Sequence, residues 1–181
     1  MKQTDEELMI AYSKGDGSAF AELYQRHKAS LFRYFVRQLP DNRARAEELF
    51  QDAWFRVVDK RQTYTEKAKF TTWLYSISHN LVVDEYRKSS VRKPELVVVG
   101  DDELSVSTDD PEQRKVSALK NCIELLPEQQ RESFLLKHEA GFETSQIGEI
   151  TGQKKETIKT RLRYALDQLR HCLTKKLGER T

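Results

Sequence analysis

The sequence predicts an all-α protein of two small helical domains joined by a flexible acidic linker. Apolar residues recur at helical spacing in both halves of the 181-residue chain, which is 38% hydrophobic and 33% charged. Between the halves, residues 91–112 carry 7 acidic and 2 basic side chains, two prolines and no helical periodicity. Residues 113–181 are basic, with 14 basic and 9 acidic side chains. We therefore expect domains at 1–90 and 113–181, with the linker at 91–112.

Four helices account for the first domain. The second of them has an apolar face that includes Phe20, Leu23, Leu31 and Phe35, and it ends before Pro40. A loop at 62–69, QTYTEKAK, has no apolar periodicity and precedes the fourth helix. The four helices are expected over residues 6–14, 18–37, 43–61 and 70–88.

The fourth predicted helix concentrates aromatic rings beside amides and cations. This combination suits single-stranded nucleic acid, because unstacked bases stack on rings while Lys and Arg pair with phosphates. Asn80 and the basic end at Arg87 and Lys88 are the functional candidates. Four other positions are expected to build the core, namely Trp73, Leu74, Ile77 and Leu81.

The linker allows two interpretations, and the sequence leaves both open. A charged stretch without periodicity is typical of a solvated spacer between domains. Its sustained negative charge also suits a strand that occupies a basic channel otherwise meant for nucleic acid.

The stretch 142–169 predicts a helix-turn-helix in the second domain. Gly148 and Gly152 stand where two helices approach closely and where the turn needs a residue without Cβ. Ile147 and Ile150 can face inward from the first helix. The second helix has a stripe for packing, made of Ile158, Leu162, Ala165 and Leu169. Its opposite face carries Lys155, Lys159, Thr160 and Arg163, which are suited to phosphates and base edges.

Nothing in the sequence indicates a metal centre, a cofactor or a catalytic site. Cys122 and Cys172 are far apart beside apolar neighbours, so we expect core residues rather than a disulfide, redox or metal pair. A helical di-iron enzyme would need Glu three residues before a histidine, and none of the four histidines has one. No apolar run reaches the roughly 20 residues that span a bilayer, and the N-terminus lacks a signal peptide, so a cytoplasmic location is expected.

Four motifs, in order along the chain, resemble those of bacterial extracytoplasmic-function sigma factors. They are ELFQDAWFRV at 48–57, FTTWLYSISHNLVVDEYRK at 70–88, LPEQQRESFLLKHEAGFETSQIGEITG at 126–152 and ETIKTRLRYALDQLR at 156–170. The resemblance implies a region 2 domain that binds core RNA polymerase and melts the −10 element, and a region 4 domain that reads the −35 element. It also implies promoter DNA as a ligand, an anti-sigma factor as a regulator, and no membrane insertion.

The resemblance also implies roles for particular residues. Those expected to face the polymerase are Glu48, Leu49, Gln51, Asp52 and Trp54. Those expected at the −10 element, where a base would be flipped toward Asn80 and the loop at 63–69, are Thr63, Lys67, Lys69, Trp73, Asn80, Arg87 and Lys88. Those expected at the −35 element are Lys155, Lys159, Thr160, Arg161, Arg163 and Tyr164, with Arg161 directed at phosphate.

The chain departs from the usual family pattern at a few positions of region 4. Lys154 stands where the family usually has a capping Ser, and Gln153 replaces an apolar residue. Tyr164 and Leu166 replace common arginines, which bears on base preference more than on the fold. A helix-turn-helix regulator that binds duplex DNA as a dimer is the alternative function, but such a protein would not need residues 48–54 or the aromatic helix.

Overall fold

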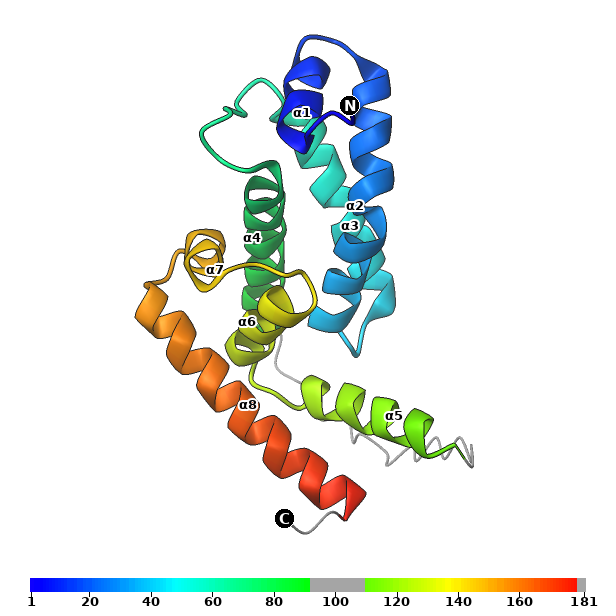
Figure 1. The fold of residues 1–181 in the computed structure, drawn as a ribbon, viewed down its shortest axis with the longest axis vertical. Helices are drawn as coiled ribbons and strands as arrows, with labels where there is room; N and C mark the ends of the chain where they lie inside the picture. The colour runs from blue at the N-terminus through cyan, green and yellow to red at the C-terminus, as the bar shows by residue number, and fades with distance from the viewer. Residues whose placement is uncertain (92–109, 179–181) are drawn as a thin grey trace.

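The computed structural model describes residues 1–91 and 110–178, and the described chain is all α-helical, as predicted (Figure 1). We refer to α1–α4 as the N-terminal half and to α5–α8 as the C-terminal half. In Figure 1, α4 lies between α2 and α3 on one side and α6 and α7 on the other. The helices are α1 (Asp5–Ser13), α2 (Gly17–Gln38), α3 (Arg43–Asp59), α4 (Phe70–Val91), α5 (Pro111–Glu124), α6 (Glu128–His138), α7 (Thr144–Thr151) and α8 (Lys155–Leu177).

The helices of the N-terminal half begin at side-chain caps. Thr4 and Glu7 form a capping box at α1, Asp16 accepts from two backbone N–H groups of α2, and Asn42 caps α3. The predicted helices agree with these elements to within a few residues. The predicted linker is too long at both ends, because α4 includes Val91 and α5 begins at Pro111. Residues 92–109 lie outside the described residues.

One hydrophobic core runs through both halves of the molecule. In the N-terminal half it contains the predicted residues Leu23, Leu31 and Phe35, which are fully buried. The same cluster continues into α6, the loop before α7, α7 and α8 through Leu136, Phe142, Ile147, Ile150 and Ile158. Across this junction the rings of Tyr75 and Phe142 lie 5.0 Å apart between centroids, edge to face. The two halves therefore pack against each other.

The helix-turn-helix is present as α7 and α8. A Cβ on Gly148 would lie 2.8 Å from the carbonyl oxygen of Gln153, so only glycine fits there without a shift of the backbone. Gly152 ends α7 at φ 69°, in the left-handed region that favours glycine. Both expectations for these glycines are confirmed. Of the predicted packing stripe, Ile158, Ala165 and Leu169 are buried and Leu162 is half-buried.

The expectation for the cysteines is wrong in one respect, because Cys122 and Cys172 form a disulfide. They stand 50 residues apart in sequence, but α5 and α8 pack together and place their Cα atoms 5.9 Å apart. Both belong to a second apolar cluster that also includes Ile123, Leu126 and Leu169. We expected unpaired cysteines because the two residues are far apart in the sequence and because a cytoplasmic protein is expected to keep its thiols reduced. Neither observation shows which helices pack together.

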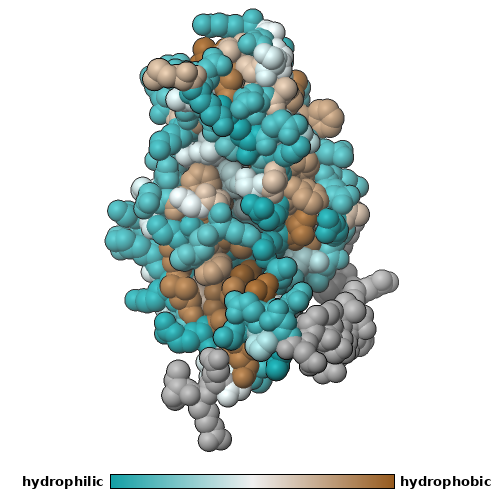
Figure 2. Space-filling view, turned by 45° about the vertical axis from the view of Figure 1, so that its right-hand side comes forward, coloured by the Kyte–Doolittle hydropathy of each residue, from teal (hydrophilic) through white to brown (hydrophobic). Residues whose placement is uncertain are grey.

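The face of the molecule that Figure 2 shows is mostly hydrophilic with apolar patches. In the view of Figure 2, apolar residues gather in the lower part of the molecule, where Figure 1 places α5 and α8. The exposed apolar side chains of these two helices are Val116, Leu119, Tyr164 and Leu166. Among the helices described, none combines the length and the apolar character that crossing a membrane would require.

Candidate functional site

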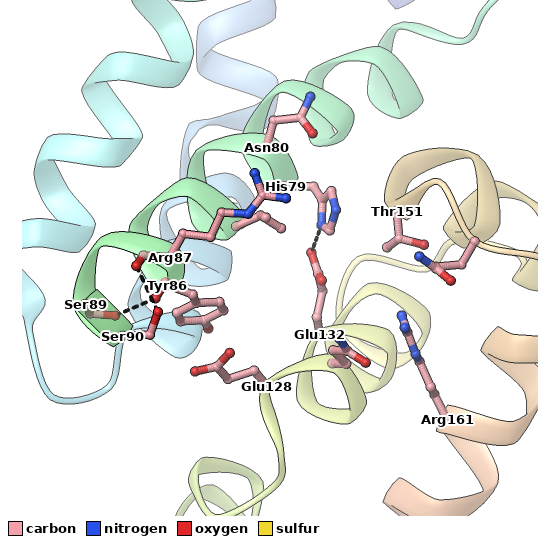
Figure 3. A pocket seen from close by; sticks show the side chains of 13 residues that line it. His79, Asn80, Tyr86, Arg87, Ser89, Ser90, Glu128, Glu132, Thr151 and Arg161 are labelled. Carbon is pink, nitrogen blue, oxygen red and sulfur yellow. Dashed lines mark hydrogen bonds and ion pairs between the residues drawn. The ribbon is translucent and has the colours of Figure 1, made fainter. Parts of the chain in front are cut away.

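A cavity of about 730 Å³ opens between α4, α6, α7 and α8 (Figure 3). Asn80 and Arg87 of α4 line it on one side, and Thr151 and Arg161 line it on the other. Two residues predicted for the −10 element and one predicted for the −35 element thus share one cavity. Its size is that of a small-molecule pocket, far too small for a DNA duplex to pass through.

Glu132 of α6 joins the two halves beneath this cavity. Its side chain is buried, with 8% of its surface exposed, and Oε1 accepts a hydrogen bond from the hydroxyl of Tyr34 at 2.7 Å. The same oxygen lies 2.6 Å from Nδ1 of His79 (Figure 3). Burial, and then the charge of Glu132, raise the pKa of the Tyr34 phenol well above its usual value, so Tyr34 remains a neutral donor.

Arg131, the neighbouring residue, makes a second set of contacts between the halves. Its guanidinium donates to the carbonyl oxygen of Gln38 at 3.2 Å and to the hydroxyl of Tyr86 at 3.0 Å. The Tyr86 hydroxyl donates in turn to the same carbonyl at 2.6 Å, and burial raises the pKa of Tyr86 to about 12. Arg131 also donates to the carbonyl of Glu124 at 3.0 Å, within its own half. We call Tyr34, Gln38, His79, Tyr86, Arg131 and Glu132 the bridging network.

On α4, the residues predicted for the −10 element form a stripe. Trp73, Asn80 and Arg87 are seven residues apart, so they lie on one face of the helix, about 10 Å from one to the next. Asn80 and Arg87 are exposed and Trp73 is half-buried. The stripe offers a ring, an amide and a cation in a row.

The loop before α4 presents the other −10 candidates. Thr63, Lys67 and Lys69 are exposed, while Tyr64 between them is buried. The Tyr64 hydroxyl donates to the carbonyl of Ala68 at 2.7 Å, and its ring lies 5.3 Å from that of Trp73. The loop and Trp73 therefore lie together, whereas Asn80 stands about two turns farther along α4 and faces the cavity.

Helix α8 presents most of the −35 candidates to solvent. Lys155, Lys159, Thr160, Arg163 and Tyr164 are exposed, whereas Arg161 is half-buried and points into the cavity (Figure 3). Lys159 pairs with Glu156 at 3.0 Å, and the Arg163 guanidinium lies 5.4 Å from the centre of the Tyr164 ring. Lys154 is the N-cap residue and its side chain caps no backbone group, in line with the missing capping Ser.

On α3, the residues predicted to bind the polymerase divide into two groups. Glu48, Gln51 and Asp52 are exposed on one face, and Glu48 also pairs with Arg45 at 2.6 Å. That Leu49 and Trp54 bind the polymerase stays a prediction, and in this conformation the two residues are only 2% and 5% exposed. Helical geometry explains it, because both residues turn away from the face of Glu48 and Asp52 and into the core.

Phe55 was missed by sequence reasoning. It is 65% exposed and lies three residues after Asp52, on the same face of α3. It borders a surface groove of about 320 Å³, and the other lining residues are Phe20, Tyr24, Phe50, Gln51, Trp54 and Val58. The sequence signal that could have identified Phe55 is a large aromatic residue on the polar face of an amphipathic helix.

Within residues 1–91 and 110–178, His, Cys, Asp and Glu form no group of three or more that could hold a metal ion.

Two family models match the chain, one in each half. The model of Sigma-70 region 2 matches residues 23–92, and the model of Sigma-70 region 4 matches residues 117–169. Among characterised proteins, the chain is 31% identical to the ECF RNA polymerase sigma factor SigW of Bacillus subtilis, covering 88% of this chain and 91% of that protein. It is 32% identical to the ECF RNA polymerase sigma factor RpoE of Cereibacter sphaeroides, covering 88% of each.

Two solved structures share the fold. CnrH, in complex with the cytosolic domain of CnrY, superposes with a TM-score of 0.71 at 18% identity, over 94% of this chain and 97% of CnrH. RpoE of Bartonella quintana, in complex with the anti-sigma factor NepR, superposes with a TM-score of 0.68 at 22% identity, over 86% of this chain and 96% of RpoE.

Proposed function

Since the chain belongs to the extracytoplasmic-function family of RNA polymerase sigma factors, we propose that it binds core RNA polymerase and directs transcription from promoters that it recognises. Residues 1–90 serve as the region 2 domain and 113–181 as the region 4 domain. One observation carries the proposal: α8, in the C-terminal half, has an exposed cationic face, and α4, in the N-terminal half, has the Trp73–Asn80–Arg87 stripe. Together they give the chain one surface for duplex DNA and another for unstacked bases.

Recognition of the −35 element is assigned to α8 in the major groove. Lys155, Lys159 and Arg163 supply positive charge, and an Arg side chain can bind guanine through two hydrogen bonds. The first N–H groups of α8 receive no side-chain cap from Lys154, so they suit a phosphate at the helix N-terminus. Thr160 and Tyr164 complete the exposed face, and Arg161 anchors a phosphate.

Opening of the −10 element is assigned to α4 and the loop before it. Extracting a base from the duplex costs a few kcal/mol, which stacking and hydrogen bonds must offset. Trp73 and Asn80 supply a ring and an amide for the base. The loop cations Lys67 and Lys69 and the terminal cations Arg87 and Lys88 hold the backbone, with Thr63 as a further polar contact.

Binding to core polymerase is assigned to the exposed face of α3. Glu48, Gln51 and Asp52 form an acidic, hydrogen-bonding patch for a partner helix, and Phe55 adds apolar area at its edge. Leu49 and Trp54 support this face from the core. The chain itself performs no covalent chemistry in this scheme, and it acts in the cytoplasm, where polymerase and promoter DNA are found.

An anti-sigma factor is proposed as the regulator. Bartonella quintana RpoE, which shares the fold, has been solved in complex with the anti-sigma factor NepR. A protein that bound both halves of this chain would cover surfaces needed for polymerase and DNA.

Reconstitution tests the proposed function. Purified chain is added to core polymerase on fragmented genomic DNA, and the transcripts are sequenced. A discrete set of new start sites sharing −35 and −10 sequences is expected, with none from core polymerase alone. Transcription that the chain leaves unchanged, together with tight binding of the chain alone to duplex DNA, would indicate a conventional helix-turn-helix regulator.

A further inference from the structure

The loop at 62–69, to which contacts with the −10 element are assigned, is held at both ends by α1. At one end, the side-chain amide of Gln62 donates to the carbonyl oxygen of Ser13 at 2.7 Å. At the other end, Oε1 of Glu6 accepts a hydrogen bond from the backbone N–H of Phe70 at 2.9 Å. We propose that these two contacts hold the loop in the conformation that receives the flipped base, so that Glu6 and Gln62 are positioning residues for promoter opening.

This role rests on the proposed function, because it takes the loop and Trp73 as the place where the −10 base is bound. It goes further in giving a task to α1, which lies before the residues that the region 2 model matches. Helix α1 would influence the DNA through the loop, without touching the DNA itself.

Glu6 supplies the cap that the residue before α4 cannot provide. The first N–H groups of a helix have no partner within the helix, and a side-chain oxygen of the preceding residue commonly accepts from them. Before α4 that residue is Lys69, whose ammonium group can only donate. The half-buried carboxylate of Glu6, 64 residues away in the sequence, takes this place, and its negative charge suits the positive end of the helix. The start of α4 therefore depends on α1.

Between these two contacts the loop packs on aromatic rings. The buried ring of Tyr64 lies 6.3 Å from the ring of Phe70 and 5.3 Å from that of Trp73, measured between centroids. Burial, and then the charge of Glu6, raise the pKa of Tyr64 to about 12, so its hydroxyl stays a neutral donor to the carbonyl oxygen of Ala68. A loop that is fixed at both ends and packed inside presents its exposed polar side chains in one arrangement.

A loop that is ordered in advance captures a base more readily. A loop that becomes ordered only when the base enters loses conformational entropy at that moment, and this loss weakens binding. Loss of either contact with α1 should therefore weaken capture of the base. The surfaces assigned to core polymerase and to the −35 element should stay as they are, because neither contact involves α3 or α8.

Opening of a mapped promoter by reconstituted holoenzyme tests the proposal. Glu6→Ala should lower the equilibrium constant for opening about tenfold, measured by permanganate reactivity of −10 thymines, because a hydrogen bond to a charged group contributes about that factor. Glu6→Gln keeps an acceptor oxygen and should restore most of the opening. Glu7→Ala is the matched control, because Glu7 is an exposed residue of the same helix and accepts from Thr4. Gln62→Ala tests the other end of the loop, and it serves if Glu6→Ala fails to fold.

Preference among −10 bases separates positioning from a simple loss of folded protein. Each variant is bound, as holoenzyme, to single-stranded oligonucleotides that carry the −10 sequence or one base change in it. Less folded protein would weaken binding to all of them alike, whereas a loosened loop lowers the ratio between the preferred base and the others. We expect this ratio to fall for Glu6→Ala and Gln62→Ala and to recover in Glu6→Gln. Co-purification with core polymerase and protection at −35 should not change.

The outcomes distinguish this proposal from the proposed function. Wild-type opening and base preference in both Glu6→Ala and Gln62→Ala would overturn it. A defect that Glu7→Ala shares, or that Glu6→Gln does not reduce, would belong to α1 in general and would overturn it too. If wild-type holoenzyme melts no promoter, the proposed function fails. Amide hydrogen exchange at Phe70 in the free chain, which should be faster in Glu6→Ala, would still decide whether Glu6 caps α4.

Discussion

At the scale of single residues, the side chains of α8 divide by where they point. Arg163 lies on the exposed face with Tyr164, whereas Arg161 points toward the cavity shared with α4. A side chain that contacts base edges contributes to sequence recognition, whereas one that contacts phosphates contributes to affinity alone. We therefore expect different defects from the loss of each arginine.

Arg163→Ala should relax base preference at one position of the −35 element, at a cost of roughly 1 to 3 kcal/mol for the preferred base. Arg161→Ala should weaken binding to all sequences alike and reduce the salt slope by about 1. Holoenzyme binding to single-base −35 variants at several salt concentrations measures both effects. A uniform loss for Arg163→Ala with the base ranking preserved would show that its role is misassigned.

Asn80→Ala should weaken promoter opening without weakening the complex with core polymerase. Asn80 is exposed on the stripe of α4 with Trp73 and Arg87, whereas the acidic patch belongs to α3. Permanganate reactivity of unpaired thymines should fall, and discrimination among −10 bases should decline with it. Normal melting with normal base preference would remove Asn80 from the −10 site.

At the scale of elements, α3 combines an acidic patch with an exposed aromatic ring. Reversing the charge of Asp52 replaces attraction with repulsion, so Asp52→Lys should weaken binding to core polymerase by roughly 2 kcal/mol or more. The fold should persist, because Asp52 is exposed. Glu47→Lys, an equal charge reversal on another face of α3, is the control. Co-purification of Asp52→Lys with core polymerase at wild-type levels would contradict the assignment.

The disulfide between α5 and α8 should stabilise the C-terminal half. Cys122 and Cys172 close a loop of 50 residues, for which chain entropy gives about 4 kcal/mol. Denaturant unfolding should therefore shift to lower concentrations when reductant is added to the wild type. The double variant Cys122→Ala/Cys172→Ala should be insensitive to reductant. Equal wild-type midpoints with and without reductant would argue against the bond in solution.

Helices were predictable from the sequence, and contacts between distant helices were not. Periodicity located α2, α4 and α8, and the requirement for glycine located the turn at Gly152. The Cys122–Cys172 bond and the contact of Glu132 with Tyr34 depend on which helices meet, and single-sequence periodicity carries no such information. The burial of Leu49 and Trp54 was not predicted either, because motif resemblance names positions without their orientation on the helix.

At the scale of the whole molecule, the two halves are joined more closely than a chain of two domains and a spacer would suggest. The core that begins between α1 and α4 continues into α6, α7 and α8, with the bridging network at the junction. Asn80 and Arg87, which are assigned to the −10 element, thus share one cavity with Arg161, which is assigned to the −35 element.

Footprinting of the purified holoenzyme on a mapped promoter tests the central claim most directly. Nuclease protection and permanganate reactivity are measured on the same fragment, with core polymerase alone and with the chain alone as controls. The proposed function predicts protection around −35 together with unpaired thymines around −10, and both should require the chain and core polymerase together. Protection by the chain alone, with no melting when core polymerase is added, would contradict it.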